Sequence, residues 1–483
     1  MVMRGIQEFI KSFAEKEGLS LKALSDKLGY KSRTSLDRIL ASQATPDSVR
    51  KLERLLLNTF KPDETDANEL HESVQVTIHG EEKYRAMKQM WVFVRGESAE
   101  ERTELHIENA VNGQEIDLKA RYGGAETPVS ITVVNGQYVS GLFYLLGELL
   151  QNSNITVSHY LYSNDDGART VSSVCSVMPV FYEKNYFGYV RQSEREQNTG
   201  LNEADFMIVE RENRNTDLIW LTGADTGVLM EVPGTADFPK KLGLKQEDYT
   251  TIKRTYFSCT ALEDYIQYSK DYAALERGHA ILKIKPDVGV DQIPTWVLRQ
   301  AMLEGNAPKD ETFMAVLNAL TAIYQKRYDD TYSKRKNACT IFKRSAFQQF
   351  ARTGRTSDHF WGMRPYTPQE RIAVLQDLVK RQETNPYVHY YFLKDDDLLR
   401  DVEISYYEGI GLLILPSDTD YNLPEGHSEV LVTHPEMLEL YREFYSEVLL
   451  CDCVCTEQET VRFLNELIRE VVHAEETGKG QET

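Results

Sequence analysis

The first sixty residues contain four apolar stripes at helical spacing, and this feature constrains the fold more than any other. Within each stripe the apolar residues recur three and four positions apart, as on one face of an amphipathic helix. Residues that end or cap helices separate the stripes, among them Gly18, Ser20, Gly29 and Pro46. The stripes are Ile6, Phe9, Ile10 and Phe13; Leu21, Leu24 and Leu28; Leu36, Ile39 and Leu40; and Val49, Leu52, Leu55 and Leu56. The pattern predicts a bundle of four short helices over residues 1–61.

Charge is distributed unevenly between this segment and the rest of the chain. The whole protein of 483 residues has a formal net charge of −20. Residues 1–61 contain twelve Lys or Arg and seven Asp or Glu, so this segment carries about +5 and the remainder about −25. A basic segment on an acidic chain is typical of a protein that contacts phosphates through one end only.

The second and third helices, with the glycine between them, resemble the Cro/C1 (lambda-repressor-like, XRE-type) family of helix-turn-helix DNA-binding domains. The resemblance covers about an eighth of the chain. It rests on Leu21–Leu28 with Gly29-Tyr30 after it, on Lys31–Leu40, and on Thr45–Val49. It implies that the third helix is a recognition helix that lies in the major groove of double-stranded DNA.

The apolar stripe of the third helix indicates which of its residues would face DNA. With Leu36, Ile39 and Leu40 turned into the bundle, the outward arc is Arg33, Thr34, Asp37 and Arg38. Arginine can fork onto guanine, and threonine and aspartate can also meet base edges. Residues at the helix ends are better placed for phosphates, and these are Lys31, Ser32, Gln43 and Thr45. One such module makes few base contacts, so we expect a homodimer on a pseudo-palindromic operator.

From about residue 127 the pattern changes to alternating strands and helices. Val129–Val134 and Ile155–Leu161 are strand-like, with an apolar helix at Tyr138–Gln151 between them. This β–α–β order favours α/β layers with parallel strands. Further strands are expected at 217–222, 280–284, 387–393, 411–415 and 429–433, and helices at 262–272, 310–324, 368–381, 435–449 and 457–472. A shared His-Tyr pair in 157–162 and 387–392 leaves two similar α/β halves as an option.

The expected fold class is therefore an all-α N-terminal helix-turn-helix bundle followed by a large α/β effector domain. The predicted boundaries are 1–61 for the DNA-binding domain, 62–125 for a helical connector, 126–330 for the first α/β half and 331–483 for the second. The connector is expected to contain helices at Glu69–Ile78 and Glu81–Val94, which join the domains or form a dimer contact.

The composition predicts a soluble, cytoplasmic protein. The longest apolar stretch, Val139–Leu150, is shorter than the about 20 residues that span a bilayer. The first residues lack the apolar region of a secretory signal, so we expect no membrane contact and six reduced cysteines. Cys451, Cys453 and Cys455 would lie too far apart along a strand for all three to bind one metal. Small buried thiols are therefore preferred to a redox or metal-sensing role.

Motifs of catalysis are absent from the sequence. It contains no Walker A loop, no Gly-x-Ser-x-Gly and no His-Glu-x-x-His. His279 and His389 precede lysines, but not at the H-x-K spacing of phosphodiesterases. We therefore expect no enzyme activity, no cofactor and no metal.

One loop, Asp358–Tyr366, concentrates aromatic, histidine and arginine side chains. Trp361 and Tyr366 are candidates for the walls of a small-molecule pocket, with Arg364 meeting an anionic group of an unknown effector. The alternative interpretation is an aromatic loop that folds onto the core, because aromatic side chains are usually buried.

These observations predict a sequence-specific DNA-binding transcriptional regulator, such as a repressor, with a C-terminal ligand-sensing or oligomerisation domain. The alternative is a non-catalytic protein-interaction module, as in the antitoxin of a toxin–antitoxin pair. An enzyme tethered to DNA is less favoured.

Overall fold

The computed structural model describes residues 5–30, 34–41, 43–95, 104–136, 139–163, 180, 183, 185–192, 204–212, 215–223, 225–233, 238–242, 244, 250–251, 253–255, 262–333, 337–356, 363–396, 402–416, 430–433, 435–450 and 453–479. These residues divide into two compact units, one up to Gln89 and one from Met90 onward. Each unit is described by itself.

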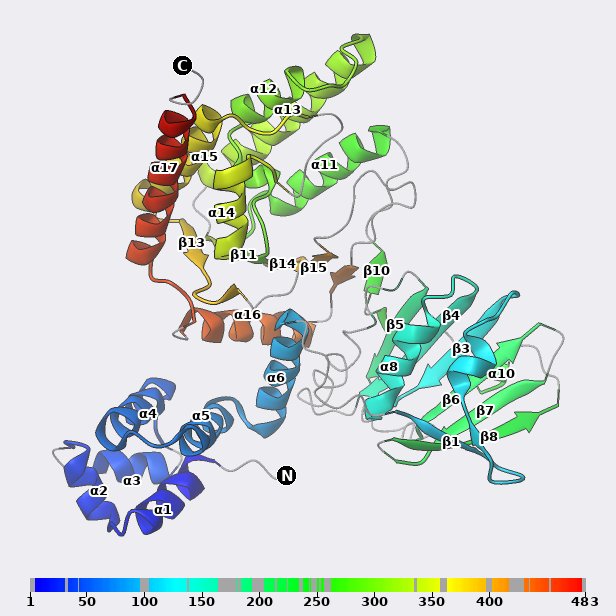
Figure 1. Cartoon of the computed structure of the whole chain (residues 1–483). Coiled ribbons are helices and arrows are strands. Elements are labelled where there is room, and N and C mark those ends of the chain that lie inside the picture. The colour runs from blue at the N-terminus through cyan, green and yellow to red at the C-terminus, as the bar shows by residue number, and fades with distance from the viewer. Residues whose placement is uncertain are drawn as a thin grey trace. The chain divides into compact units, whose positions relative to one another are not determined.

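The first unit consists of helices (Figure 1). They are α1 (Ile6–Lys16), α2 (Leu21–Lys27), α3 (Thr34–Leu40), α4 (Pro46–Phe60), α5 (Glu64–His79) and the start of α6 (Glu81–Arg95). The four apolar stripes meet in one core, which Leu70 and Val74 of α5 complete. Helix α5 packs against α1 and α4, and the Ile6 amide donates to Thr77 Oγ1 at 2.8 Å. The helical unit therefore continues beyond the boundary expected at residue 61.

The second unit is a mixed α/β structure with two sheets, which confirms the α/β class expected for this part of the chain. Within the described residues, the first sheet has nine strands in the order β2-β1-β8-β7-β6-β3-β4-β5-β9. These strands are β1 (His106–Asn109), β2 (Glu115–Ile116), β3 (Val129–Val134), β4 (Ile155–Ser163), β5 (Tyr186–Gln192), β6 (Phe206–Arg211), β7 (Thr216–Leu221), β8 (Thr226–Val232) and β9 (Thr250–Thr251). Helices α7 (Leu118–Tyr122), α8 (Ser140–Leu149) and α10 (Phe238–Lys241) lie between these strands along the chain.

For the second sheet the structure describes seven strands, in the order β10-β16-β15-β14-β11-β12-β13. These strands are β10 (Lys253–Thr255), β11 (Ile281–Lys285), β12 (Ala338–Phe342), β13 (Val388–Phe392), β14 (Val402–Tyr407), β15 (Gly411–Pro416) and β16 (Val430–Val432). Its helices are α11 (Leu262–Glu276), the 3₁₀ turn η4 (Val290–Gln292), α12 (Thr295–Leu303), α13 (Glu311–Ser333), α14 (Arg344–Thr353), α15 (Pro368–Thr384), α16 (Pro435–Leu450) and α17 (Glu457–Lys479). Most of these helices lie where the sequence pattern predicts them.

Both sheets contain the same arrangement of a parallel set of strands and an antiparallel meander beside it. In the first, β3, β4 and β5 are parallel, and β6, β7 and β8 form an antiparallel meander that starts against β3. In the second, β11, β12 and β13 are parallel, and β14, β15 and β16 form the same meander against β11. The α/β region therefore contains two halves of similar topology.

The boundary between these halves differs from the prediction of a second half that starts at residue 331. Strand β11 hydrogen-bonds to β12 and β14, so the second half includes 262–330, and residue 330 falls inside α13. The His-Tyr echo also does not align the halves. His159 lies on β4, the second parallel strand of its sheet, whereas His389 lies on β13, the third of its sheet.

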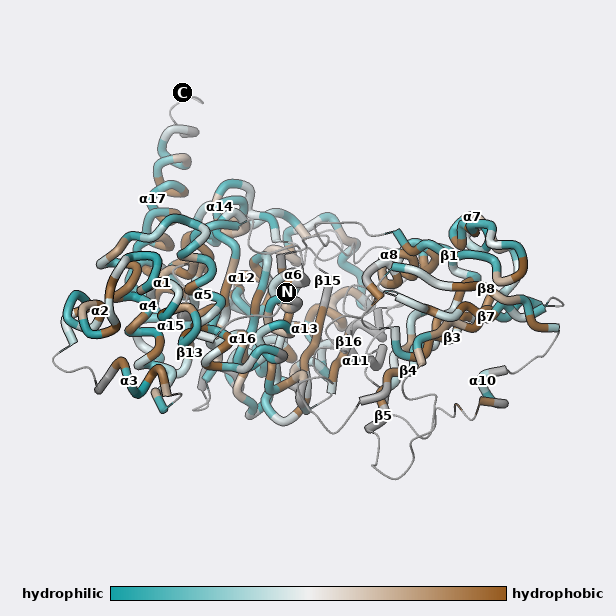
Figure 2. The backbone as a smooth tube through the Cα atoms, turned by 90° about the horizontal axis from the view of Figure 1, so that it is seen from below, coloured by the Kyte–Doolittle hydropathy of each residue, from teal (hydrophilic) through white to brown (hydrophobic). Residues whose placement is uncertain are grey.

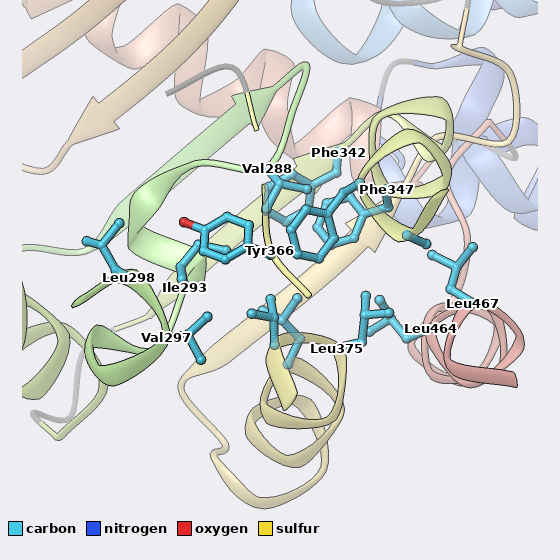
Figure 3. Packing of buried hydrophobic residues seen from close by; sticks show 14 of the residues in the cluster. Val288, Ile293, Val297, Leu298, Phe342, Phe347, Tyr366, Leu375, Leu464 and Leu467 are labelled. Atoms are coloured by element: carbon cyan, nitrogen blue, oxygen red, sulfur yellow. The ribbon is translucent and has the colours of Figure 1, made fainter. Parts of the chain in front are cut away.

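A large apolar core fills the space between the second sheet and its helices. Figure 3 shows Phe342 and Phe347 packed beside Tyr366, with Leu375 of α15 and Leu464 of α17 completing the layer. Hydrophobic residues run along strand β15 in Figure 2, whereas α17 alternates between hydrophilic and hydrophobic positions. That alternation is the expected signature of a helix with one buried face. In the described part of the chain, no helix is long and apolar enough to cross a membrane.

Candidate functional site

Helix α3 has one buried face and one exposed face. Leu36 and Ile39 are buried in the core of the first unit, while Asp37 and Arg38 are exposed. Gly29 ends the preceding helix with φ +75°, a left-handed conformation that glycine adopts without a steric penalty. At the other end of α2, Ser20 Oγ accepts a hydrogen bond from the Ala23 amide at 3.2 Å. The local structure therefore holds α3 with Arg38 directed outward.

The remaining predicted DNA contacts are only partly within the described residues. Gln43 and Thr45 are exposed, and the Thr45 hydroxyl lies 3.0 Å from that of Ser48. Thr34 starts α3, but the structure describes only its backbone. Three predicted contacts lie outside the described residues, namely Lys31, Ser32 and Arg33.

The basic character of residues 1–61 does not extend over the whole first unit. Residues 62–89 add seven acidic and three basic side chains, so the chain up to Gln89 has fifteen basic and fourteen acidic residues. One of the added acids, Asp66, forms an ion pair with a basic residue of α1, because Lys16 Nζ lies 2.6 Å from Asp66 Oδ2. The positive charge is therefore a local property of the segment that contains α2 and α3, not of the unit.

The structure places two of the three predicted effector contacts in structural roles, and Trp361 lies outside the described residues. Arg364 forms ion pairs with Glu304 at 2.6 Å and Glu370 at 2.7 Å, so two carboxylates already compensate its charge. Tyr366 is buried, and its ring packs against Phe350 at 5.8 Å between centroids. These contacts fit the alternative interpretation, an aromatic loop folded onto the core, and we do not propose a pocket here.

The cysteines also differ from the expectation that all six are reduced. Cys453 is disulfide-bonded, whereas Cys339 and Cys455 are free and buried. Burial raises the pKa of the Cys339 thiol to about 12, which makes it a poor nucleophile. Cys451 lies outside the described residues. Among the residues that are described, no group of three or more His, Cys, Asp or Glu side chains is arranged to hold a metal ion.

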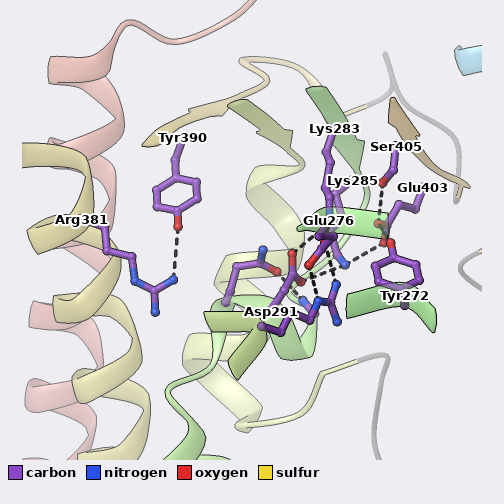
Figure 4. A network of polar contacts seen from close by, with 12 residues as sticks. Tyr272, Glu276, Lys283, Lys285, Asp291, Arg381, Tyr390, Glu403 and Ser405 are labelled. Atoms are coloured by element: carbon purple, nitrogen blue, oxygen red, sulfur yellow. Dashed lines mark hydrogen bonds and ion pairs between the residues drawn. The ribbon is translucent and has the colours of Figure 1, made fainter. Parts of the chain in front are cut away.

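A buried cluster of charged side chains lies on β11, an interior strand of the second sheet, and the sequence interpretation missed it (Figure 4). Lys283 and Lys285 are two positions apart on β11, so both project from the same face of the sheet. Glu276 ends α11, Asp291 lies in η4, and Glu403 lies on β14 beside Lys285. Arg327 of α13 completes the cluster, which has three cations and three carboxylates.

The ions of this cluster are paired with one another. Lys283 Nζ lies 2.8 Å from Glu276 Oε1 and 3.3 Å from Asp291 Oδ2. Lys285 Nζ lies 2.7 Å from Glu403 Oε2 and 3.3 Å from Asp291 Oδ1. Arg327 Nη2 donates to Glu276 Oε1 at 2.9 Å. The cluster as a whole is therefore electrically neutral.

Pairing keeps these groups charged in spite of their burial. Burial alone would lower the pKa of Lys283, but the surrounding carboxylates, Glu276 first, raise it well above its ordinary value. Burial would likewise raise the pKa of Asp291, but Lys285 and Lys283 hold it well below the usual range. A cavity of about 20 Å³ beside Lys283 and Arg327 has room for about one water molecule.

Two features separate this cluster from an ordinary core. Strand β3, which has the corresponding place in the first sheet, contains no charged residue on either face, so the shared topology does not require charges there. In addition, replacing a buried ion pair by apolar residues of similar size is often neutral or stabilising. The sequence signal was the pair of lysines in the apolar run Ile281–Lys285, but their partners are up to 118 residues away, the separation of Lys285 from Glu403.

Comparisons with known proteins give no family for this chain. No protein-family model matches it, and no curated protein does. Among solved structures, the crystal structure of polyphosphate kinase from Porphyromonas gingivalis is similar over 73% of this chain, at 11% sequence identity. The chain spans 53% of that protein, about half its length, and the TM-score is 0.18. A score this low carries no argument about fold or activity.

Proposed function

We propose that this protein is a DNA-binding transcriptional regulator that uses α3 as its recognition helix. The observation that carries the proposal is the orientation of α3, with Leu36 and Ile39 in the core and Arg38 exposed. A helix anchored in this way can enter the major groove, where arginine recognises guanine through two hydrogen bonds. The resemblance of residues 21–49 to the Cro/C1 family supports the same assignment.

The proposal assigns DNA binding and effector functions to different parts of the chain. The α/β region is the effector part, which senses a small molecule, oligomerises, or does both. A second copy of the protein would place a second α3 on the other half of a pseudo-palindromic operator. The acidic α/β region would repel the DNA backbone and so confine contact to the basic segment.

Selection of binding sites from a random pool of duplex DNA tests the proposal. The full-length protein should enrich sites that share an inverted repeat. Arg38→Ala should weaken binding to the selected site by about 1–3 kcal/mol per lost base contact, with folding intact. Arg54→Ala is the matched control, because Arg54 is also exposed but lies on α4. Both variants lose one positive charge, so non-specific attraction to DNA falls equally.

Three results would contradict the proposal. They are no enrichment by a folded wild-type protein, enrichment without a common sequence, and an equal loss of affinity in the Arg38 and Arg54 variants. The last result would mean that charge alone, rather than base recognition by α3, accounts for the binding.

A further inference from the structure

A groove of about 370 Å³ lies on the second unit between three helices. Its lining residues come from the start of α12, from the next helix, α13, and from the more distant α15. On α15 the lining residues are spaced as one helical stripe, which places them on the same face. The lining includes Trp296 of α12, Tyr328 of α13, and Asp377 and Lys380 of α15. The volume is within the range typical of small-molecule pockets.

Trp296 is the first feature that points to a ligand. Its side chain is 60% exposed, although tryptophan is a largely buried residue in most proteins. A second ring, that of Tyr328, also lines the groove. Two aromatic rings on one groove favour an occupant with a planar ring, because aromatic groups gain from stacked or edge-to-face contact.

The charges of the groove are the second feature. Asp377 is fully engaged, since it accepts from the Tyr328 hydroxyl at 3.0 Å and is ion-paired with Arg381. Arg381 in turn lies 4.2 Å from the centre of the Tyr328 ring. Lys380 is exposed, and no carboxylate of the described residues is within ion-pair distance of its ammonium group. Among the described residues that line the groove, Lys380 is therefore a positive charge without an ion-pair partner.

From these features we infer that the groove binds a small molecule with a planar aromatic ring and one anionic group. The ring packs on Trp296, and the anionic group pairs with Lys380. Two classes of compound have this chemistry, aromatic carboxylates and nucleoside monophosphates. The inference rests on the proposed function only for its regulatory consequence, because the binding site itself needs no DNA.

The groove also adjoins the charged cluster. Tyr328 lines both the groove and the small cavity beside Lys283 and Arg327. Arg381 Nη1 donates to the hydroxyl of Tyr390, which lines the cavity as well, at 3.4 Å. A ligand that displaces Tyr328 would therefore act directly on the wall of the cluster.

Ligand-observed NMR titration of the full-length protein without DNA tests the inference. The probes are 2-naphthoate and adenosine 5′-monophosphate, each compared with a neutral analogue, 2-naphthamide and adenosine. Trp296→Ala should weaken binding of the bound probe at least about fivefold, as expected for loss of a stacked ring. Lys380→Ala should weaken it about two- to fivefold and leave the neutral analogue unaffected. Trp220→Ala is the matched control, because Trp220 is 50% exposed but lies on the first sheet.

The probes also distinguish the two sources of the ligand. Binding of 2-naphthoate alone assigns an aromatic carboxylate, and binding of adenosine 5′-monophosphate alone assigns a nucleotide. Binding of neither probe overturns the inference, as does binding that Trp296→Ala and Trp220→Ala weaken equally. Arg38→Ala should bind the probe as wild type does, so a failure of the groove is distinguishable from a failure of DNA binding. Circular dichroism of each variant verifies that it is folded.

Discussion

Glu276→Gln is the most informative perturbation of the buried charged cluster. The Glu276 carboxylate accepts from Lys283 and Arg327, at 2.8 Å and 2.9 Å through Oε1. Glutamine has nearly the same shape but no charge, so the substitution leaves the cluster with one net positive charge in a buried site. Removing one partner of a buried ion pair costs about 3–5 kcal/mol. The second half contains about 220 residues, for which this cost lowers the unfolding midpoint by about 6–20 °C.

The measurement is thermal unfolding of the full-length protein, followed by calorimetry so that the transition of the second half is resolved. Glu304→Gln is the control, because it also removes a carboxylate bound to an arginine, but at an exposed position. It should change the midpoint little, since solvent screens exposed pairs.

A double-mutant cycle separates charge balance from simple loss of packing. Lys283→Met removes one cation from the same cluster, so Glu276→Gln with Lys283→Met restores neutrality. The double variant should be more stable than the sum of the two single effects predicts, by about 0.5–3 kcal/mol. A Glu276→Gln protein within about 1 kcal/mol of wild type, or single effects that simply add, would refute the reasoning that charge balance holds this cluster together.

Two other predictions follow from single buried positions. Burial lowers the pKa of His159 to about 4, and its Nδ1 lies 2.9 Å from the Tyr186 hydroxyl, so the imidazole is neutral in the folded state. Stability from this group is present above the unfolded pKa of about 6.5 and is lost as pH falls towards 4, up to about 3 kcal/mol. Urea unfolding between pH 7 and pH 4 should show this loss, and His159→Gln should reduce it; an unchanged pH dependence in the variant would contradict the assignment. Gly354→Ala should destabilise the protein more than Gly409→Ala in the same assay. Both glycines have positive φ, for which a side chain costs about 1–2 kcal/mol, but only at Gly354 would a Cβ lie 2.2 Å from the Tyr366 carbonyl oxygen. Equal effects of the two substitutions would exclude that clash.

The local pattern of the sequence predicts most of the long helices and the strands β3, β4, β7, β11, β13, β15 and β16, because periodicity reflects which face of an element is buried. It does not predict other strands of the two sheets, among them β6, β8, β12 and β14. It predicts the inward face of α3 through Leu36 and Ile39, and the structure has these two residues in the core. The pattern does not predict which elements pair. The placement of β11 in the second half depends on hydrogen bonds to β12 and β14, which no local spacing encodes.

The local pattern of the sequence is even less able to identify the candidate functional positions. The composition of its loop favours Arg364 as an anion contact, yet Glu304, from 60 positions earlier in the chain, already binds its guanidinium. The groove at Trp296 has no sequence motif, because its walls come from three helices whose neighbourhood is set by the core. Lys380 and Trp296 are unremarkable on their own helices, and only the tertiary structure brings them to one surface.

The order of strands in the first sheet has a consequence for synthesis on the ribosome. Strand β1 is parallel to β8, with His106 opposite Thr226, so β1 emerges about 120 residues before its partner. At translation rates of about 5–20 residues per second, the nascent β1 waits for about 6–24 seconds. During this interval Ile107, which is fully buried in the finished sheet, has no place in which to pack. The hairpin of β1 and β2 is thus the earliest part of the first sheet to be made, but β1 cannot complete its pairing until β8 has been synthesised.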